Sequence, residues 1–199
     1  MPALESPSEA RSTTTPSAFT KLNVGGGKGH PRLPGWAIVD LRETADVRVD
    51  ISREALPFAD GSIDVVFTSH TLEHILPQRL GFVLDEFRRV LKPGGLLRGD
   101  GDFRLLDQQL GEFERAEVTP FDAAAPIGGL LMSWFYSTSA VGNGHVHCFD
   151  EAYLLSWLES HGFNHVRRSA FRSSSLDELR SEHFDRHPND TLFMEATRA

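Results

Sequence analysis

The segment 63–68, IDVVFT, constrains the fold most, because nearly all of its side chains are β-branched or aromatic. Continuous runs of this kind are typical of strands that are buried on both faces of a parallel sheet. A helical spacing of apolar residues follows at 80–91. The sequence 92–95, KPGG, ends that helix, because proline cannot continue it and glycine accepts the left-handed turn. A buried strand followed by a helix and a stop predicts a β-α unit of an α/β protein.

Further strands and helices are predicted along the rest of the chain. The strands are expected at 21–24, 36–40, 47–50, 96–98, 166–171 and 192–196, and the helices at 151–160 and 176–184. Asp150 is a favourable N-cap for the first of these two helices, and His161-Gly162 ends it. The alternation favours an α/β three-layer sandwich around a mostly parallel sheet. We expect one domain over 19–199, after a mobile tail at 1–18 that is rich in Ser, Thr and Pro.

Charge and composition narrow the class of partner. The chain has 28 acidic and 20 basic residues, a net charge of −8, whereas a nucleic-acid-binding surface needs a basic field. No apolar run approaches the roughly 20 residues that span a bilayer, and the N-terminus lacks the order of a signal peptide. Cys148 is the only cysteine, so no disulfide frame or thiolate zinc site is expected. We expect a cytoplasmic monomer or homodimer with a small-molecule partner, no nucleic acid and no membrane span.

Glycines, carboxylates and a histidine follow the first four predicted strands. Gly25 to Gly27 come after the first strand, Asp40 after the second, Asp50 after the third and His70 after the fourth. In open α/β sheets, ligands bind beyond the carboxyl ends of the strands, at the switch point. These residues are therefore the candidate ligand-binding residues.

The glycine loop does not suit a dinucleotide. A G-x-G-x-x-G loop that feeds a helix is needed for a pyrophosphate, but His30 stands at the third glycine position and Pro31 and Pro34 prevent a regular helix. S-adenosylmethionine (SAM) fits better, because it carries an adenosine without a phosphate. Asp40 could accept hydrogen bonds from both ribose hydroxyls and Asp50 from the adenine amino group. A flexible loop and solvated carboxylates are the alternatives.

Four segments carry a family resemblance, namely KLNVGGG, LPGWAIVD, ALPFADGSIDVVFTSHTLEHI and EFRRVLKPGG. They resemble the class I SAM-dependent methyltransferases, in particular the small bacterial type-11 branch, over residues 20–98. CFDEAYLLSWLESHGF and TLFMEAT resemble the final helix and hairpin of that family more loosely. The resemblance implies a Rossmann-like fold with a mostly parallel seven-stranded sheet, an antiparallel C-terminal hairpin and SAM as cofactor. The cofactor-binding residues that it implies are Asn23, Gly25, Gly26, Gly27, Asp40, Leu41, Asp50, Ile51 and Ser69.

Several positions depart from the family pattern. Many relatives carry an acid where this chain has Asn23 and a residue such as cysteine where it has Gly26, and the first helix is nearly deleted. The sequence RGDGD at 98–102 replaces a more apolar pattern. These changes support an alternative in which the chain is a non-catalytic SAM-fold binding or scaffold protein.

The sequence His70-Thr71-Leu72-Glu73-His74 has two interpretations. An H-x-x-E-H zinc metallopeptidase needs both histidines inside a formed helix, a third ligand and an open position for water. His70, however, directly follows a predicted strand. The resemblance places the segment at the methyl-donor end, where His70 would be the catalytic general base. A strand-end histidine bonded to backbone is the alternative, and Glu73 and His74 are expected to cap the next helix or to line the pocket.

The connection 99–149 is expected to form the acceptor pocket. Its aromatic residues suit an apolar or ring-shaped acceptor. Candidate substrate-binding residues are His74, Trp134, Tyr136 and His145, and no metal is expected. A loop packed over the sheet is the alternative for the connection, and an incidental surface pair, or less readily a metal site, for His145 and His147. Together these features predict SAM-dependent methyl transfer to a small-molecule or saccharide-linked acceptor.

Overall fold

The computed structural model describes residues 19–27, 29–102, 145–146, 149–186, 188 and 191–199. The predicted tail at 1–18 and most of the connection 99–149 lie outside these ranges. No helix within the described ranges is both long and apolar enough to cross a bilayer.

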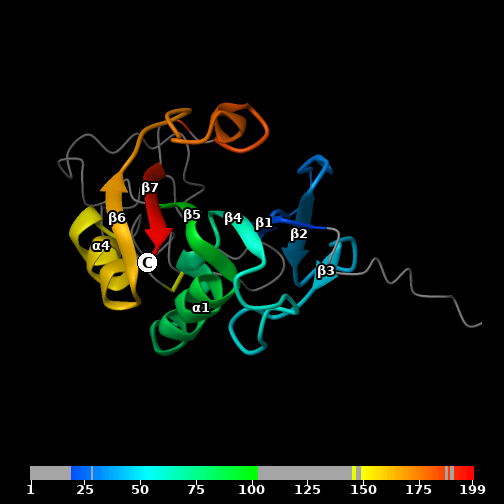
Figure 1. The fold of residues 1–199 in the computed structure, drawn as a ribbon, viewed down its shortest axis with the longest axis horizontal. Coiled ribbons are helices and arrows are strands. Elements are labelled where there is room, and N and C mark those ends of the chain that lie inside the picture. The colour runs from blue at the N-terminus through cyan, green and yellow to red at the C-terminus, as the bar shows by residue number, and fades with distance from the viewer. Residues whose placement is uncertain (1–18, 28, 103–144, 147–148, 187, 189–190) are drawn as a thin grey trace, which may run out of the picture.

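Seven strands form a single sheet in the order β3-β2-β1-β4-β5-β7-β6 (Figure 1). The first five strands pair in parallel, whereas β7 is antiparallel to both β5 and β6. This topology confirms the predicted mostly parallel sheet with an antiparallel C-terminal end. The strands are β1 (Lys21–Val24), β2 (Trp36–Asp40), β3 (Val47–Arg48), β4 (Ile63–Ser69), β5 (Leu91–Asp102), β6 (Phe163–Arg168) and β7 (Thr191–Arg198).

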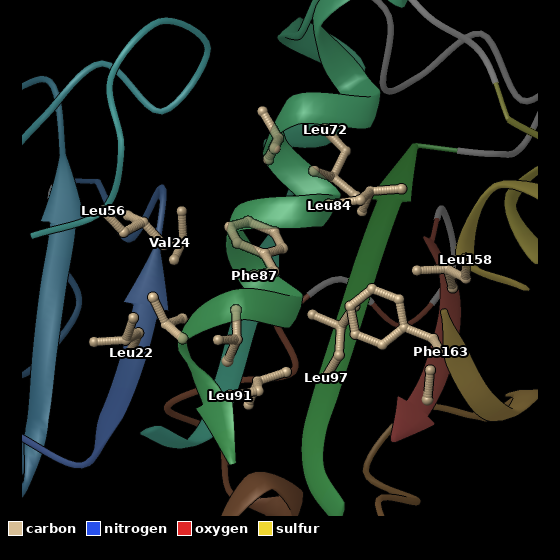
Figure 2. Close-up of a cluster of buried hydrophobic side chains, with 14 of the residues drawn as sticks. Leu22, Val24, Leu56, Leu72, Leu84, Phe87, Leu91, Leu97, Leu158 and Phe163 are labelled. Carbon is tan, nitrogen blue, oxygen red and sulfur yellow. The ribbon is translucent and has the colours of Figure 1, made fainter. Parts of the chain in front are cut away.

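Helices α1 (Pro77–Val90) and α4 (Glu151–Ser160) contribute to one hydrophobic core on a face of the sheet. The apolar stripe of α1 is buried in the same core as residues of β1 and β5, and Figure 2 shows Phe87 of α1 between Val24 of β1 and Leu97 of β5. The predicted cap of α4 is confirmed, because the Asp150 carboxylate accepts a hydrogen bond from the Tyr153 amide at 2.7 Å. Helix α1 runs directly into β5, whose pairing with β4 is interrupted by a bulge between Ile63 and Val65.

The opposite face of the sheet is covered by the connection between β6 and β7. There Leu179 and Phe184 pack on Trp36, Val65 and Phe67. The predicted helix at 176–184 is wrong, since this stretch holds only the 3-10 helix η3 (Asp177–Arg180). Tertiary contacts outweigh the helical pattern here, because the Glu178 side chain pairs with Lys21 and accepts a hydrogen bond from Trp36 Nε1 at 2.6 Å.

The first helix of the expected fold is absent from the described residues between β1 and β2, as its proline content predicted. The β6–β7 connection supports this loop instead. Arg186 Nη2 donates a hydrogen bond to the Gly29 carbonyl at 2.9 Å, and Lys21 at the start of β1 pairs with Glu178. A segment near the C-terminus thus supports the first loop of the sheet.

A buried ion network explains the arginine in the RGDGD sequence. Arg98 is fully buried in β5 and makes a two-point contact with the buried Asp185, at 2.6 and 3.2 Å. Its Nη1 also lies 3.2 Å from Glu195 Oε1 of β7. A buried charge needs partners of this kind, so the network ties β5 and β7 to the connection that covers the second face.

Candidate functional site

The glycine loop lies at the switch point of the sheet, where β1 pairs with β2 on one side and β4 on the other. Gly25 has a φ of +75°, and a Cβ on it would lie 1.9 Å from the Thr71 hydroxyl oxygen. Gly27 has a φ of +57°. Only glycine adopts such angles without strain and lets the backbone come this close, so the ends of β1 and β4 meet through a bare loop.

Asp40 ends β2 and points at this loop. Its Oδ2 accepts a hydrogen bond from the Gly27 amide at 3.0 Å, and its Oδ1 accepts one from the Arg42 amide at 3.0 Å. The Arg42 guanidinium lies over the same place, 3.4 Å from Asp40 Oδ2 and 2.7 Å from where a Gly27 Cβ would be. The structure therefore brings a carboxylate and the glycine loop together, with one exposed cation beside them.

Asp50 is directed into its own turn. Its Oδ1 accepts hydrogen bonds from the Ser52 amide at 3.0 Å and the Ser52 hydroxyl at 2.6 Å, and its Oδ2 lies 3.5 Å from Arg53 Nε. Strand β3 accordingly ends at Arg48, two residues before the predicted end. Of the two neighbouring candidates, Ile51 packs against the main core and Leu41 is 56% exposed at the end of β2.

Asn23 forms a polar pair under the loop. It is buried in β1, its Nδ2 lies 3.1 Å from His30 Nδ1, and its Oδ1 has no hydrogen-bond partner in the described part of the chain. Burial, together with the positive charge of Arg186, lowers the pKa of His30 to about 4. The imidazole is thus neutral at pH 7, and its Nδ1 can accept a hydrogen bond from the Asn23 side-chain amide. A carboxylate in place of Asn23 would instead favour the protonated imidazole. A Cβ on Gly26 would lie 3.1 Å from the Asn23 side chain.

His70 follows β4 directly, as predicted, with a φ of 45° that non-glycine residues rarely adopt. Its Nε2 lies 3.1 Å from the Thr191 hydroxyl, and its Nδ1 lies 3.2 Å from Glu73 Oε1. Ser69 pairs with Asp100 in the β4–β5 register, so these residues lie where β4 and β5 approach their carboxyl ends. A base candidate flanked by a carboxylate has the arrangement that orients a histidine for proton transfer.

Glu73 and His74 belong to the 3-10 helix η2 (Leu72–His74), and His145 comes from the segment before α4. The His74 and His145 rings meet edge to face at 4.8 Å, and the Val146 amide donates to the Glu73 carbonyl at 2.8 Å. Burial lowers the pKa of His145, His74 and His70 add to that shift, and the Glu73 carboxylate opposes it. Two of the four substrate-binding candidates, His74 and His145, thus lie together, whereas Trp134 and Tyr136 fall outside the described residues.

The peptidase interpretation does not fit this geometry. His70 precedes η2, which has only three residues, so His70 and His74 do not lie one turn apart on a helix. Three residues have more contacts at this site than their sequence context predicts. Glu73, which is expected to cap the helix or line the pocket, is fully buried. Arg42 and His30 are neighbours of the glycine loop through Asp40 and Asn23. The sequence signal for Glu73 is an acid placed between two histidines, His70 and His74.

Comparisons with known proteins agree with this fold. A family described as a methyltransferase domain matches residues 38–98, which are 61 of the 199 residues. An uncharacterised methyltransferase of Mycolicibacterium vanbaalenii is 36% identical over 107 residues, and one of Mycobacterium sp. strain KMS is 41% identical over 105. Each alignment covers 44% of this chain, and the chain spans only 41% and 40% of these relatives.

Solved structures show the same fold across nearly the whole chain. A SAM-dependent methyltransferase from Archaeoglobus fulgidus superposes with a TM-score of 0.57 at 17% identity, covering 91% of this chain and 86% of that one. The methyltransferase CalH in complex with S-adenosylhomocysteine (SAH) gives a TM-score of 0.50 at 17% identity, covering 92% and 52%.

Proposed function

We propose that this chain, a member of the class I SAM-dependent methyltransferase family with the family's methyltransferase domain at residues 38–98, binds SAM and transfers its methyl group. One observation carries the proposal: the Asp40 carboxylate points at the amide of Gly27 across the switch point. A carboxylate beside a bare backbone loop matches an adenosine with two ribose hydroxyls and no phosphate. The neighbour that was solved with SAH supports the choice of cofactor.

The proposed cofactor cradle uses the first three strand ends. Gly25, Gly26 and Gly27 admit the ligand close to the backbone, Asp40 accepts from the ribose, and Asn23 offers an unpaired buried Oδ1 beneath the loop. Asp50 is held in its own turn by Ser52, whereas Asp40 contacts the glycine loop, so the proposed share of Asp50 in the binding is smaller than that of Asp40.

Methyl transfer from a sulfonium is an in-line displacement at carbon. The leaving sulfur is activated by its own positive charge, so the protein mainly positions the acceptor and removes its proton. His70 is the proposed base, because it stands at the end of β4 with Glu73 beside its Nδ1. The proposed acceptor is a small molecule or a saccharide-linked group, bound by His74, His145, Trp134 and Tyr136.

Calorimetric titration with SAM and with SAH tests the cofactor. We expect both to bind, and Asp40→Ala to weaken SAM about 100-fold or more, since each lost charge-assisted hydrogen bond contributes roughly 1.5–3 kcal/mol. Asp177→Asn, at a carboxylate that is 88% exposed on η3, is the matched control and leaves the affinity unchanged. Silent titrations with both ligands would remove the proposal, and an unchanged affinity in Asp40→Ala would remove the ribose contact.

The base is tested by His70→Asn, because asparagine tolerates the positive φ of this position better than most residues. We expect turnover of an acceptor to fall while SAM affinity is retained. Undiminished turnover would show that His70 is not the base. If neither the wild type nor the variant shows turnover while both bind SAM, the result would instead favour a non-catalytic SAM-fold protein, as the departures at Asn23 and Gly26 suggest.

A further inference from the structure

Three potential metal ligands converge beside the end of β4. Glu73 and His74 come from η2, and His145 comes from a segment about 70 residues later. One ligand atom from each of the three lies within 4.8 Å of the other two. The hydrogen bond from the Val146 amide to the Glu73 carbonyl holds the two segments in this arrangement.

The Glu73 carboxylate has few of the partners that a buried charge needs. Its side chain is 0% exposed, and neither oxygen accepts a hydrogen bond from the described residues. His70 Nδ1 lies 3.2 Å from Oε1, an ion pair only when the imidazole is protonated. His74 Nδ1 is also buried without a partner in this part of the chain. A fully buried carboxylate needs more compensation than one neighbouring imidazole, so a cation bound beside Glu73 would be stabilising.

We propose that Glu73, His74 and His145 bind one divalent transition-metal ion, for which zinc is the best match. Two imidazoles and one carboxylate are the ligands of catalytic zinc sites, where a fourth position stays open for water or substrate. Calcium and magnesium are disfavoured, because they take mostly oxygen ligands.

The distances allow such a site after a small adjustment. Tetrahedral coordination at about 2.1 Å places ligand atoms roughly 3.4 Å apart, so the widest separation here has to shrink by about 1.4 Å. Side-chain rotation of His74 and His145, both partly exposed, can supply this movement without displacing the buried Glu73.

The net charge of the loaded site indicates what it would hold. A +2 ion with one carboxylate and two neutral imidazoles leaves one positive charge, which suits an anionic oxygen or sulfur as fourth ligand. This step rests on the proposed methyl transfer: the acceptor hydroxyl or thiol binds the ion and loses its proton to His70, the proposed base. The new bond from that oxygen or sulfur to the methyl carbon forms as the sulfonium carbon–sulfur bond breaks, and its electron pair returns to the sulfur of SAH. The site therefore assigns an ionisable hydroxyl or thiol to the acceptor.

The proposal departs from the expectation that no metal binds. A structural role for Glu73 as a partner of His70 alone would not require the ligand atoms of Glu73, His74 and His145 to lie within 4.8 Å of one another.

The test is metal binding to the purified full chain after dialysis against a chelator. We expect calorimetry with zinc chloride to show one ion per chain, and cobalt(II) to show the visible absorption of a four-coordinate site. Glu73→Gln and His145→Asn should each weaken zinc binding about 100-fold or more, because they remove ligands and not only outer-shell groups. Control variants Glu159→Gln and His165→Asn change an exposed acid and an exposed histidine outside the cluster and should bind zinc as the wild type does.

Two further measurements keep the result unambiguous. Without metal, Glu73→Gln should unfold at the same temperature as the wild type or a higher one, because it removes a fully buried charge. Its loss of zinc binding then cannot come from misfolding. SAM titrations run in parallel separate the two proposals. If the wild type binds SAM but no stoichiometric zinc, or if Glu73→Gln binds zinc with wild-type affinity, the metal site alone is overturned. If the wild type binds zinc but not SAM, the methyltransferase proposal alone is overturned.

Discussion

Replacing one member of the Arg98 network should cost far more stability than any surface ion pair. Asp185→Asn keeps the shape of the side chain but removes the charge that meets Arg98 at 2.6 and 3.2 Å, with both side chains 0% exposed. Glu195 remains 3.2 Å from the guanidinium, so the arginine keeps one partner. Breaking a buried pair typically costs 3–5 kcal/mol, and the remaining partner places our expectation at about 3 kcal/mol.

The double variant Arg98→Met/Asp185→Asn provides the sharper test. Burial would raise the pKa of Glu195, but hydrogen bonds from Arg167 and Ser174 outweigh it and hold the pKa below its usual range. Glu195 thus stays ionised at pH 7, and Arg167 at 2.8 Å balances it once Arg98 is gone. Removing one positive and one negative charge together leaves no unpaired buried charge, so the double variant should lose less stability than the two single variants combined.

Urea or thermal unfolding measures these differences. About 3 kcal/mol corresponds to a fall in Tm of roughly 6–12 °C in a chain of this size. Lys92→Met is the control, because its partner Asp64 is 44% exposed and such surface pairs contribute about 1 kcal/mol or less. If Asp185→Asn loses no more free energy of unfolding than Lys92→Met, the buried ion pair does not contribute the stability inferred from its geometry. The same holds if the losses of the two single variants simply add in the double variant.

Three further outcomes follow from the loop and the second core. Gly25→Ala should destabilise the fold by roughly 1–3 kcal/mol and weaken SAM in calorimetry, because its Cβ would meet Thr71 at 1.9 Å and φ is +75°; wild-type stability would contradict the crowding. His30 has a folded-state pKa near 4, below its unfolded value, so the native state binds fewer protons and stability should fall as pH drops from about 6.5 to 4. Urea melts over this range should show a shallower fall for His30→Asn, and identical slopes would contradict the shift. Leu179→Ala should cost about 2–5 kcal/mol in thermal unfolding, since the side chain is fully buried against the second face; a loss below 1 kcal/mol would show that η3 does not seal it.

Elements with a local signal could be predicted from the sequence. The buried run of β4, the N-cap Asp150 and the prolines that prevent a first helix each act within a few residues, and all three expectations are confirmed. The pairing of the strands is not local, and the family resemblance supplied the expected mostly parallel seven-stranded sheet with its antiparallel C-terminal hairpin. The placement of Asp40 at the glycine loop agrees with the expected site, while its role with ribose stays a prediction.

Features that depend on distant contacts could not be read from the sequence. The 176–184 stretch has a helical pattern, but Glu178 is drawn to Lys21 and Trp36, more than 140 positions away, and only one 3-10 turn forms. The pairing of Asn23 with His30 and the convergence of His145 on Glu73 are likewise products of the folded arrangement. In such cases the sequence shows that a polar residue is present, but it does not show which distant residue lies next to it in the fold.

The support of the first loop by Arg186 has a consequence for co-translational folding. Gly29 and Arg186 are 157 positions apart, so at about 5–20 residues per second the ribosome adds the second roughly 8 to 30 s after the first. During that interval Trp36 and Phe67 lack the ring of Phe184, which packs against both of them in the folded protein. The nascent N-terminal half therefore exposes an apolar sheet face until the C-terminal segment is synthesised. During that time the face is open to chaperone binding or to aggregation.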